Sequence, residues 1–195
     1  MADTRKILKV FLASPSDLKE ERRAAKAAVD EINSLVANPF GYHVELVGWE
    51  DTVARFGRPQ ALINAELDHC EYFIGMLWKR WGTPPDNDGI YTSGFEEEFK
   101  RSLARRASDG RPEMALFFKE VESEFLRDPG DDLKKVLAFR ADLVAKKILL
   151  FETFADVSEF EKKLRKCLAD YVHALRMQEA AEISAERQVR PAASG

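Results

Sequence analysis

The stretch ILKVFLASPSDLKEER, residues 7–22, contains the transition that decides the fold. Residues 7–13 form a short apolar run of β-forming residues, which predicts a strand buried on both faces. From Leu18 onward the apolar side chains recur at steps of three, four and seven up to Val36, the spacing of a helix with one buried face. The stretch therefore predicts a buried strand, a tight turn and an amphipathic helix.

The same alternation continues along the chain. Further strands are expected at 43–49, 71–78, 113–119 and 147–154, and further helices at 58–70, 93–107, 131–146 and 156–176. Five strands that alternate with helices predict an α/β fold, a five-stranded parallel sheet flanked by helices on both faces in a three-layer sandwich. We expect one domain over 5–176 and a polar tail or linker over 177–195.

Composition excludes several classes of protein. The chain has 195 residues, 45% of them hydrophobic, and a net charge of -4, which favours neither nucleic acid nor an anionic membrane as a partner. The longest apolar runs have about seven residues, too few to span a membrane. Cys70 and Cys167 lie far apart without metal-ligand spacing, so we expect reduced thiols, a cytoplasmic location and no metal site.

Ligands of parallel α/β folds bind beyond the carboxyl ends of the strands, where the strand order reverses. No GxxxxGK[ST] or GxGxxG motif is present there. Ser14, Ser16 and Asp17 follow the first strand, and a helix start at this turn could bind phosphate through its free N–H groups. The alternative is that Ser14 caps the helix, with Asp17 as the capping-box acid.

Aromatic and basic residues stand at the other strand ends. Trp49, Glu50, Arg80, Trp81 and Gly82 are candidate ligand-binding residues, and Trp81 is the best placed tryptophan to stack on a base or nicotinamide ring. The alternative for each tryptophan, including Trp78, is that it closes the core beneath the loops. Arg22 lies beside the buried face of the first helix, where it makes an ion pair, extends to solvent, or orients a carboxylate.

The stretch YTSGFEEEF, residues 91–99, places three carboxylates at a helix start. Ser93 is the expected N-cap and a candidate ligand contact, and Glu96 occupies the capping-box position. Glu97 is expected to face solvent and pair with Arg101 one turn later. Glu98 lies on the flank of the apolar stripe, where partial burial can tune its pKa. The helix geometry thus favours Glu98 as a catalytic residue, with Glu96 as second choice.

Three segments carry a family resemblance: KVFLASPSDLKEER (9–22), CEYFIGMLWKRWG (70–82) and YTSGFEEEFKRSLA (91–104). They resemble the domain of unknown function 4062, which commonly begins NACHT, TPR and WD-repeat proteins. That family is similar to flavodoxin-like Toll/interleukin-1 receptor (TIR) domains and to nucleoside deoxyribosyltransferases. TIR domains that cleave NAD carry the pattern SxWCxxEL, which places Thr92 at its serine and Glu98 at its catalytic glutamate. Gly94 and Phe95 stand in place of Trp-Cys.

The resemblance implies three alternatives. The chain is an effector or signalling domain of a larger defence protein that cleaves the N-glycosidic bond of NAD or a related nucleotide. Alternatively it is a non-catalytic interaction or nucleotide-sensing module, or a nucleoside N-glycosidase. NAD is then a candidate substrate, no cofactor is required, and the expected partners are further copies or other domains of the same protein. If the domain is non-catalytic, we expect Glu98 to pair with a basic side chain beside a shallow pocket.

Overall fold

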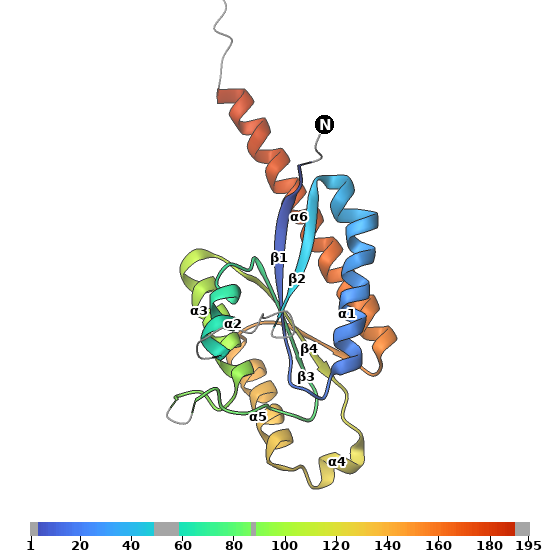
Figure 1. Ribbon diagram of the computed structural model, residues 1–195, viewed down its shortest axis with the longest axis vertical. Helices are drawn as coiled ribbons and strands as arrows, with labels where there is room; N and C mark the ends of the chain where they lie inside the picture. Colours follow the sequence, from blue (N-terminus) through green and yellow to red (C-terminus); the bar gives the residue numbers. More distant parts are fainter. Residues whose placement is uncertain (1–3, 49–58, 87–88, 190–195) are drawn as a thin grey trace, which may run out of the picture.

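The computed structural model of the protein describes residues 4–48, 59–86 and 89–189 and contains one parallel sheet (Figure 1). Its five strands pair in the order β2-β1-β3-β4-β5. They are β1 (Lys6–Ala13), β2 (Tyr42–Val47), β3 (Tyr72–Leu77), β4 (Glu113–Lys119) and β5 (Phe151–Phe154). This is the flavodoxin-like order, in which the direction of winding reverses between β1 and β3. The predicted fold class is confirmed.

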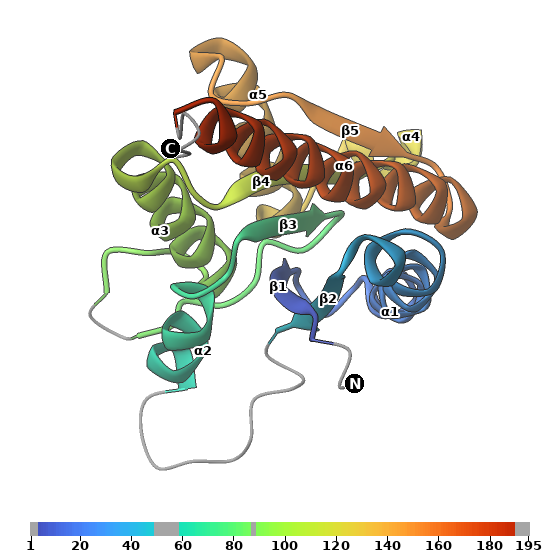
Figure 2. The same cartoon turned by 90° about the horizontal axis from the view of Figure 1, so that it is seen from above.

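Helices cover both faces of the sheet (Figure 2). One face is covered by α1 (Lys19–Ile32), which runs on through a π-helical turn (Asn33–Ala37) and a 3-10 turn (Asn38–Phe40), and by α6 (Val157–Val189). The other face is covered by α2 (Pro59–Leu67), α3 (Gly94–Asp109) and α5 (Asp131–Lys146). A short helix, α4 (Ser123–Arg127), follows β4.

Strand residues alternate between two hydrophobic cores. In β1, Leu8 and Val10 pack against α1 and α6, whereas Phe11 and Ala13 pack toward α2, α3 and α5. All of β3 is buried. Ile74 packs in the core beneath α1 and α6, whereas its neighbour Phe73 packs in the core on the other face of the sheet. A strand covered on both faces reads as a continuous apolar run, which is why the sequence pattern located these strands.

Three element boundaries differ most from the prediction. Helix α1 begins at Lys19 rather than at Ser14 and has no side-chain cap. Strand β5 begins at Phe151 rather than at residue 147, because Lys147 ends α5 with φ 51° and Leu150 is 96% exposed. Helix α6 continues to Val189, so most of the predicted polar tail is helical.

The extension of α6 is tied to the start of the sheet. Lys6 Nζ lies 3.3 Å from Glu179 Oε1. Burial and the nearby Glu179 carboxylate raise the pKa of Tyr42, at the start of β2, to about 12. No helix within the described residues has the length and apolar composition needed to cross a membrane.

Candidate functional site

A cavity of about 480 Å³ lies at the carboxyl ends of β1 and β3, where the strand order reverses. Its wall is built from the turn after β1, from α1 and α2, from the segment after β3, and from the starts of α3 and α5. The polar side chains that line it are Ser14, Ser16, Arg22, Gln60, Arg80, Thr83, Glu98 and Asp132. Its place in the fold is where a ligand of a doubly wound sheet is expected.

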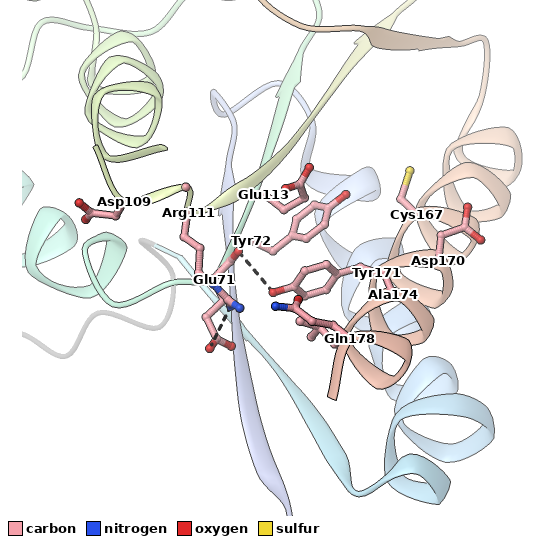
Figure 3. A pocket seen from close by; sticks show the side chains of 12 residues that line it. Glu71, Tyr72, Asp109, Arg111, Glu113, Cys167, Asp170, Tyr171, Ala174 and Gln178 are labelled. Carbon is pink, nitrogen blue, oxygen red and sulfur yellow. Dashed lines mark hydrogen bonds and ion pairs between the residues drawn. The ribbon is translucent and has the colours of Figure 1, made fainter. Parts of the chain in front are cut away.

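A second cavity, of about 640 Å³, lies at the opposite edge of the sheet, where β3 and β4 begin beside α6 (Figure 3). There Arg111 Nη1 lies 3.6 Å from Glu71 Oε1, and the Tyr171 hydroxyl donates to the Glu71 carbonyl at 3.5 Å. None of the predicted site residues that the structure describes lines it. Although this cavity is larger, its location at the amino ends of the strands makes the first cavity the better candidate.

The start of α3 is fixed by Ser93, as predicted. The Ser93 hydroxyl accepts a hydrogen bond from the backbone N–H of Glu96 at 3.1 Å, and the residue is fully buried. The cap therefore uses this side chain, and Ser93 is not among the described residues that line the cavity, so its contact with a ligand stays a prediction. Because the cap sets the phase of α3, it also decides which faces the following three glutamates occupy.

Glu96 stabilises the helix start rather than facing the cavity. Its Oε2 accepts from the backbone N–H and the hydroxyl of Thr92, both at 2.7 Å, and its Oε1 lies 2.6 Å from Lys100 Nζ. Burial raises the pKa of Glu96, but the hydrogen bonds from Lys100 and Thr92 outweigh it and the net pKa is lowered. Glu96 reaches back to Thr92, one residue before the cap, and is not part of the cavity wall.

Glu97 contradicts the prediction that it faces solvent. It is 6% exposed, and Asn64 Nδ2 on α2 donates to its Oε1 at 2.6 Å. Arg101, the expected partner, makes a two-pronged contact with Asp68, with Nε–Oδ1 at 2.6 Å and Nη2–Oδ2 at 2.5 Å. The reason is that α2 packs on this flank of α3, which the periodicity of α3 alone does not reveal.

Glu98 lies in the cavity wall, as the helix geometry predicted. It is 8% exposed, and its Oε1 accepts a hydrogen bond from Gln60 Nε2 at 3.0 Å. Burial raises the pKa of Glu98 to about 7; the charge of Glu97 raises it as well, while the Gln60 hydrogen bond and the charge of Arg22 lower it. No described residue donates a hydrogen bond to Glu98 Oε2. The carboxyl group is therefore poised to change charge near neutral pH.

Arg22 shapes the turn after β1. Its guanidinium donates to the Ser14 hydroxyl through Nε at 2.6 Å, to the Ser14 carbonyl, and to the Pro15 carbonyl at 3.2 Å. These contacts hold Ser14 against α1 and explain why Ser14 is not a helix cap. Arg22 therefore has a structural role in this turn. Its positive charge also lowers the pKa of Glu98.

Asp17 joins two cavity segments instead of capping α1. Its Oδ2 accepts from the backbone N–H groups of Lys79 at 3.1 Å and Arg80 at 2.9 Å. The same two segments, the turn after β1 and the segment after β3, also meet where Arg80 Nη1 lies 3.3 Å from the Ser16 hydroxyl. The predicted capping role of Asp17 is wrong, and the residue does not line the cavity. Ser16 and Arg80 line it, and both are exposed.

Trp81 is part of a hydrophobic core. Trp81 is 4% exposed, packs against Phe95 and Phe139 at ring distances of 6.0 and 5.3 Å, and donates from Nε1 to the Thr92 hydroxyl at 2.7 Å. This burial favours the core role over an open stacking face, although the residue borders the cavity. Gly82 beside it has φ 97°, a conformation that favours glycine.

Trp78 is held on the opposite side of the sheet. Its Nε1 donates to the Glu120 carbonyl at 3.1 Å, and the ammonium groups of Lys79 and Lys119 lie 4.1 and 4.5 Å from its ring. Trp49 and Glu50, also predicted as ligand contacts, lie outside the described residues.

The residues at or near the cavity that were not predicted include Gln60, Asn64 and Asp132. Gln60 and Asn64 are one turn apart on α2 and are both at least nine-tenths buried. Two amides at this spacing within an otherwise apolar helix indicate a buried polar contact, and this signal was available in the sequence. Asp132 lies in the first turn of α5, where an acid is also explained by the helix dipole.

Cys70 and Cys167 are free thiols, as expected. Within residues 4–48, 59–86 and 89–189, no group of three or more His, Cys, Asp or Glu side chains could hold a metal ion.

Several solved structures are similar to this chain at low sequence identity. A conserved protein from Enterococcus faecalis V583 is 13% identical, over 82% of this chain and 98% of that one, with a TM-score of 0.39. The TIR domains of the activated Roq1 resistosome that recognises the effector XopQ are 13% identical, over 90% and 99%, with a TM-score of 0.42. A short-chain flavodoxin associated with a PDU bacterial microcompartment is 9% identical, over 84% and 99%, with a TM-score of 0.40.

No curated protein matches the chain. A family profile, by contrast, matches nearly the whole folded part, from residue 9 to residue 169. The matched range contains all the segments on which the predicted resemblance rests and every described residue of the cavity wall. The chain belongs to the family described as a domain of unknown function (DUF4062).

Proposed function

We propose that this domain cleaves the N-glycosidic bond of NAD or a related nucleotide, with Glu98 as the catalytic carboxylate. The observation that carries the proposal is the placement of Glu98, a nearly buried acid in the cavity wall at the reversal of strand order. Its pKa of about 7 leaves a substantial ionised fraction at neutral pH. Its observed partner is the neutral amide of Gln60 rather than a basic side chain, which supports the catalytic alternative over the non-catalytic one.

Cleavage of the N-glycosidic bond requires a single carboxylate from the protein. The bond between ribose C1′ and the ring nitrogen of nicotinamide breaks, and its electron pair leaves with neutral nicotinamide. The ribose becomes an oxocarbenium-like cation, which an adjacent carboxylate stabilises or captures as a covalent ester. Water then adds at C1′ and loses a proton. No electron donor, acceptor or metal ion takes part in these steps.

The cavity wall also offers groups for the phosphates. Arg80 and Ser16 are exposed at its rim and lie 3.3 Å apart between guanidinium Nη1 and hydroxyl oxygen. A guanidinium is a strong donor to phosphate oxygens. In this proposal they hold the diphosphate while Glu98 faces the ribose. The proposal extends to the setting of the domain: we infer that it belongs to a larger defence or signalling protein and is triggered when that protein assembles.

A second candidate is nucleotide sensing without turnover. It is favoured by the burial of the aromatic rings in the cavity wall, because Phe11, Trp81 and Phe95 are each at least 95% buried and therefore offer little surface on which a departing nicotinamide ring could stack. A sensing domain would bind the nucleotide through Arg80 and Ser16 and release no base.

The test is release of free nicotinamide from NAD and NADP by the purified protein, at high concentration and on a multimerising scaffold. We expect release by the wild type, its loss in Glu98→Ala, and its retention in the control Glu96→Ala, which changes a neighbouring acid outside the cavity. A deoxynucleoside in a parallel reaction tests the nucleoside N-glycosidase alternative. Absence of release under every condition would overturn the proposal for these substrates, and nucleotide binding without release would favour sensing.

A further inference from the structure

Two amide side chains of α2 form a buried polar ladder with two carboxylates of α3. Gln60 Nε2 donates to Glu98 Oε1 at 3.0 Å and to Asn64 Oδ1 at 3.3 Å. Asn64 Nδ2 in turn donates to Glu97 Oε1 at 2.6 Å. Gln60 is 9% and Asn64 6% exposed, so these hydrogen bonds form away from bulk water, where they gain strength.

The two carboxylate oxygens of Glu98 have different hydrogen-bonding environments. Oε1 is held from α2 by Gln60, whereas Oε2 receives no hydrogen bond from any described residue. Because the side chain lines the cavity, the held oxygen fixes the orientation of the carboxyl plane and leaves the second oxygen for a ligand. A carboxylate that must act on a ribose carbon needs this kind of fixed orientation.

Gly94 makes room for the Gln60 amide. A Cβ built on Gly94 would lie 2.8 Å from Gln60 Oε1 and 4.0 Å from Glu98 Oε1. Any side chain at position 94 would therefore displace the amide that holds Glu98. This explains why a residue of poor helix propensity occupies the first position of α3.

We propose that Gln60 is the positioning residue of Glu98, and that Gly94 provides the space in which its amide reaches the carboxylate. This inference rests on the proposed function for its meaning, but its geometry is independent of turnover. Gln60 does not itself carry out a chemical step; it acts through Glu98.

Other charged groups share the surroundings of Glu98. Arg22 approaches from α1 and Glu97 from its own helix, while Arg80 after β3 and Asp132 on α5 line the same cavity. None of them is altered in the variants below, so a change in the pKa of Glu98 reports on the Gln60 contact.

The experiment measures the pKa of Glu98 directly, by carbon-13 NMR of the glutamate side-chain carboxyl groups in the whole chain, with Glu98→Gln used for assignment. We expect a pKa of about 7 in the wild type. Gln60→Leu removes the donor to the ionised form, so we expect the pKa to rise by about one unit or more. Gly94→Ala keeps the amide but pushes it away, and we expect a rise in the same direction.

Gly130→Ala is the matched control, because a Cβ there meets nothing within 4 Å and the backbone angles are ordinary. Circular dichroism of each variant verifies the fold, and Gly94→Ala serves as the test if Gln60→Leu does not fold. An unchanged Glu98 pKa in the folded Gln60→Leu or Gly94→Ala variant would overturn the inference.

Nicotinamide release separates this inference from the proposed function. If the wild type releases nicotinamide, Gln60→Leu is expected to lower kcat more than it raises KM and to move the pH profile upward together with the NMR pKa. A changed pKa without release by the wild type supports the positioning role and refutes the proposed reaction. An unchanged pKa refutes the positioning role, whatever the activity.

Discussion

Replacing Glu98 by glutamine is predicted to stabilise the protein at high pH and to leave its stability nearly unchanged at low pH. Burial raises the pKa of Glu98 from 4.5 to about 7. A carboxyl group with a raised pKa in the folded state binds its proton more tightly there than in the unfolded chain. The free energy of unfolding of the wild type therefore falls as pH rises from about 4.5 to about 7.

The magnitude follows from the two pKa values. One pKa unit corresponds to about 1.4 kcal/mol, so ionising Glu98 in the folded protein costs about 3 kcal/mol once the pH exceeds 7. Because Glu98 is only 8% exposed, solvent screening reduces this value little. Glutamine has a similar shape and cannot ionise, so Glu98→Gln removes the cost. Such a gain in stability on loss of a functional group is typical of active sites.

Urea unfolding of both proteins at pH 4.5 and pH 8 measures the effect. The stability advantage of Glu98→Gln is predicted to grow by about 3 kcal/mol between these two pH values. Glu96→Gln is the matched control: the lowered pKa of Glu96 stabilises the wild type mainly above about pH 4.5, so the stability difference between Glu96→Gln and the wild type should change little between pH 4.5 and pH 8. An advantage of Glu98→Gln that does not change with pH would refute the reasoning about burial.

Three further changes test the packing around the site. The Glu21 side chain is 2% exposed, and its carboxylate lies 2.7 Å from Lys119 Nζ. Lys119→Met leaves this carboxylate as a buried unpaired charge and should lower the free energy of unfolding, measured by urea titration, by about 3–5 kcal/mol. A loss below about 1 kcal/mol would show that the ion pair is dispensable. Ser93→Ala removes the cap of α3 and should cost about 1 kcal/mol, again by urea unfolding, and an unchanged midpoint would contradict the capping role. Gly75→Ala places a Cβ 2.4 Å from Leu116 Cδ2 and should cost about 1–3 kcal/mol in thermal unfolding, whereas an unshifted transition would mean that the core adapts.

The fold was predictable because its strands are buried on both faces. Residues 7–13 and 71–78 read as apolar runs for that reason, and the alternation with amphipathic helices then leaves few arrangements. The position of Glu98 was also predictable, since Ser93 caps α3 and the cap fixes the helix phase. Both inferences use local information only.

The errors arise where a segment contacts another that is distant in the sequence. Glu97 was expected in solvent because the periodicity of α3 does not show that Asn64 on α2 covers it. Asp17 has the spacing of a capping acid, yet the backbone N–H groups of Lys79 and Arg80 take its carboxylate. In each case the partner is more than thirty residues away in the sequence, and only the assembled fold identifies it.

The pH dependence of nicotinamide release from NAD tests the central claim most directly. If Glu98 acts as an ionised carboxylate, the rate should rise with pH through an apparent pKa of about 7, the value to which burial raises this group. The rise should be absent in Glu98→Ala and preserved in Glu96→Ala. A rate that is flat between pH 5.5 and 8.5, or a rise that persists without Glu98, would contradict the assignment of this carboxylate as the catalytic group.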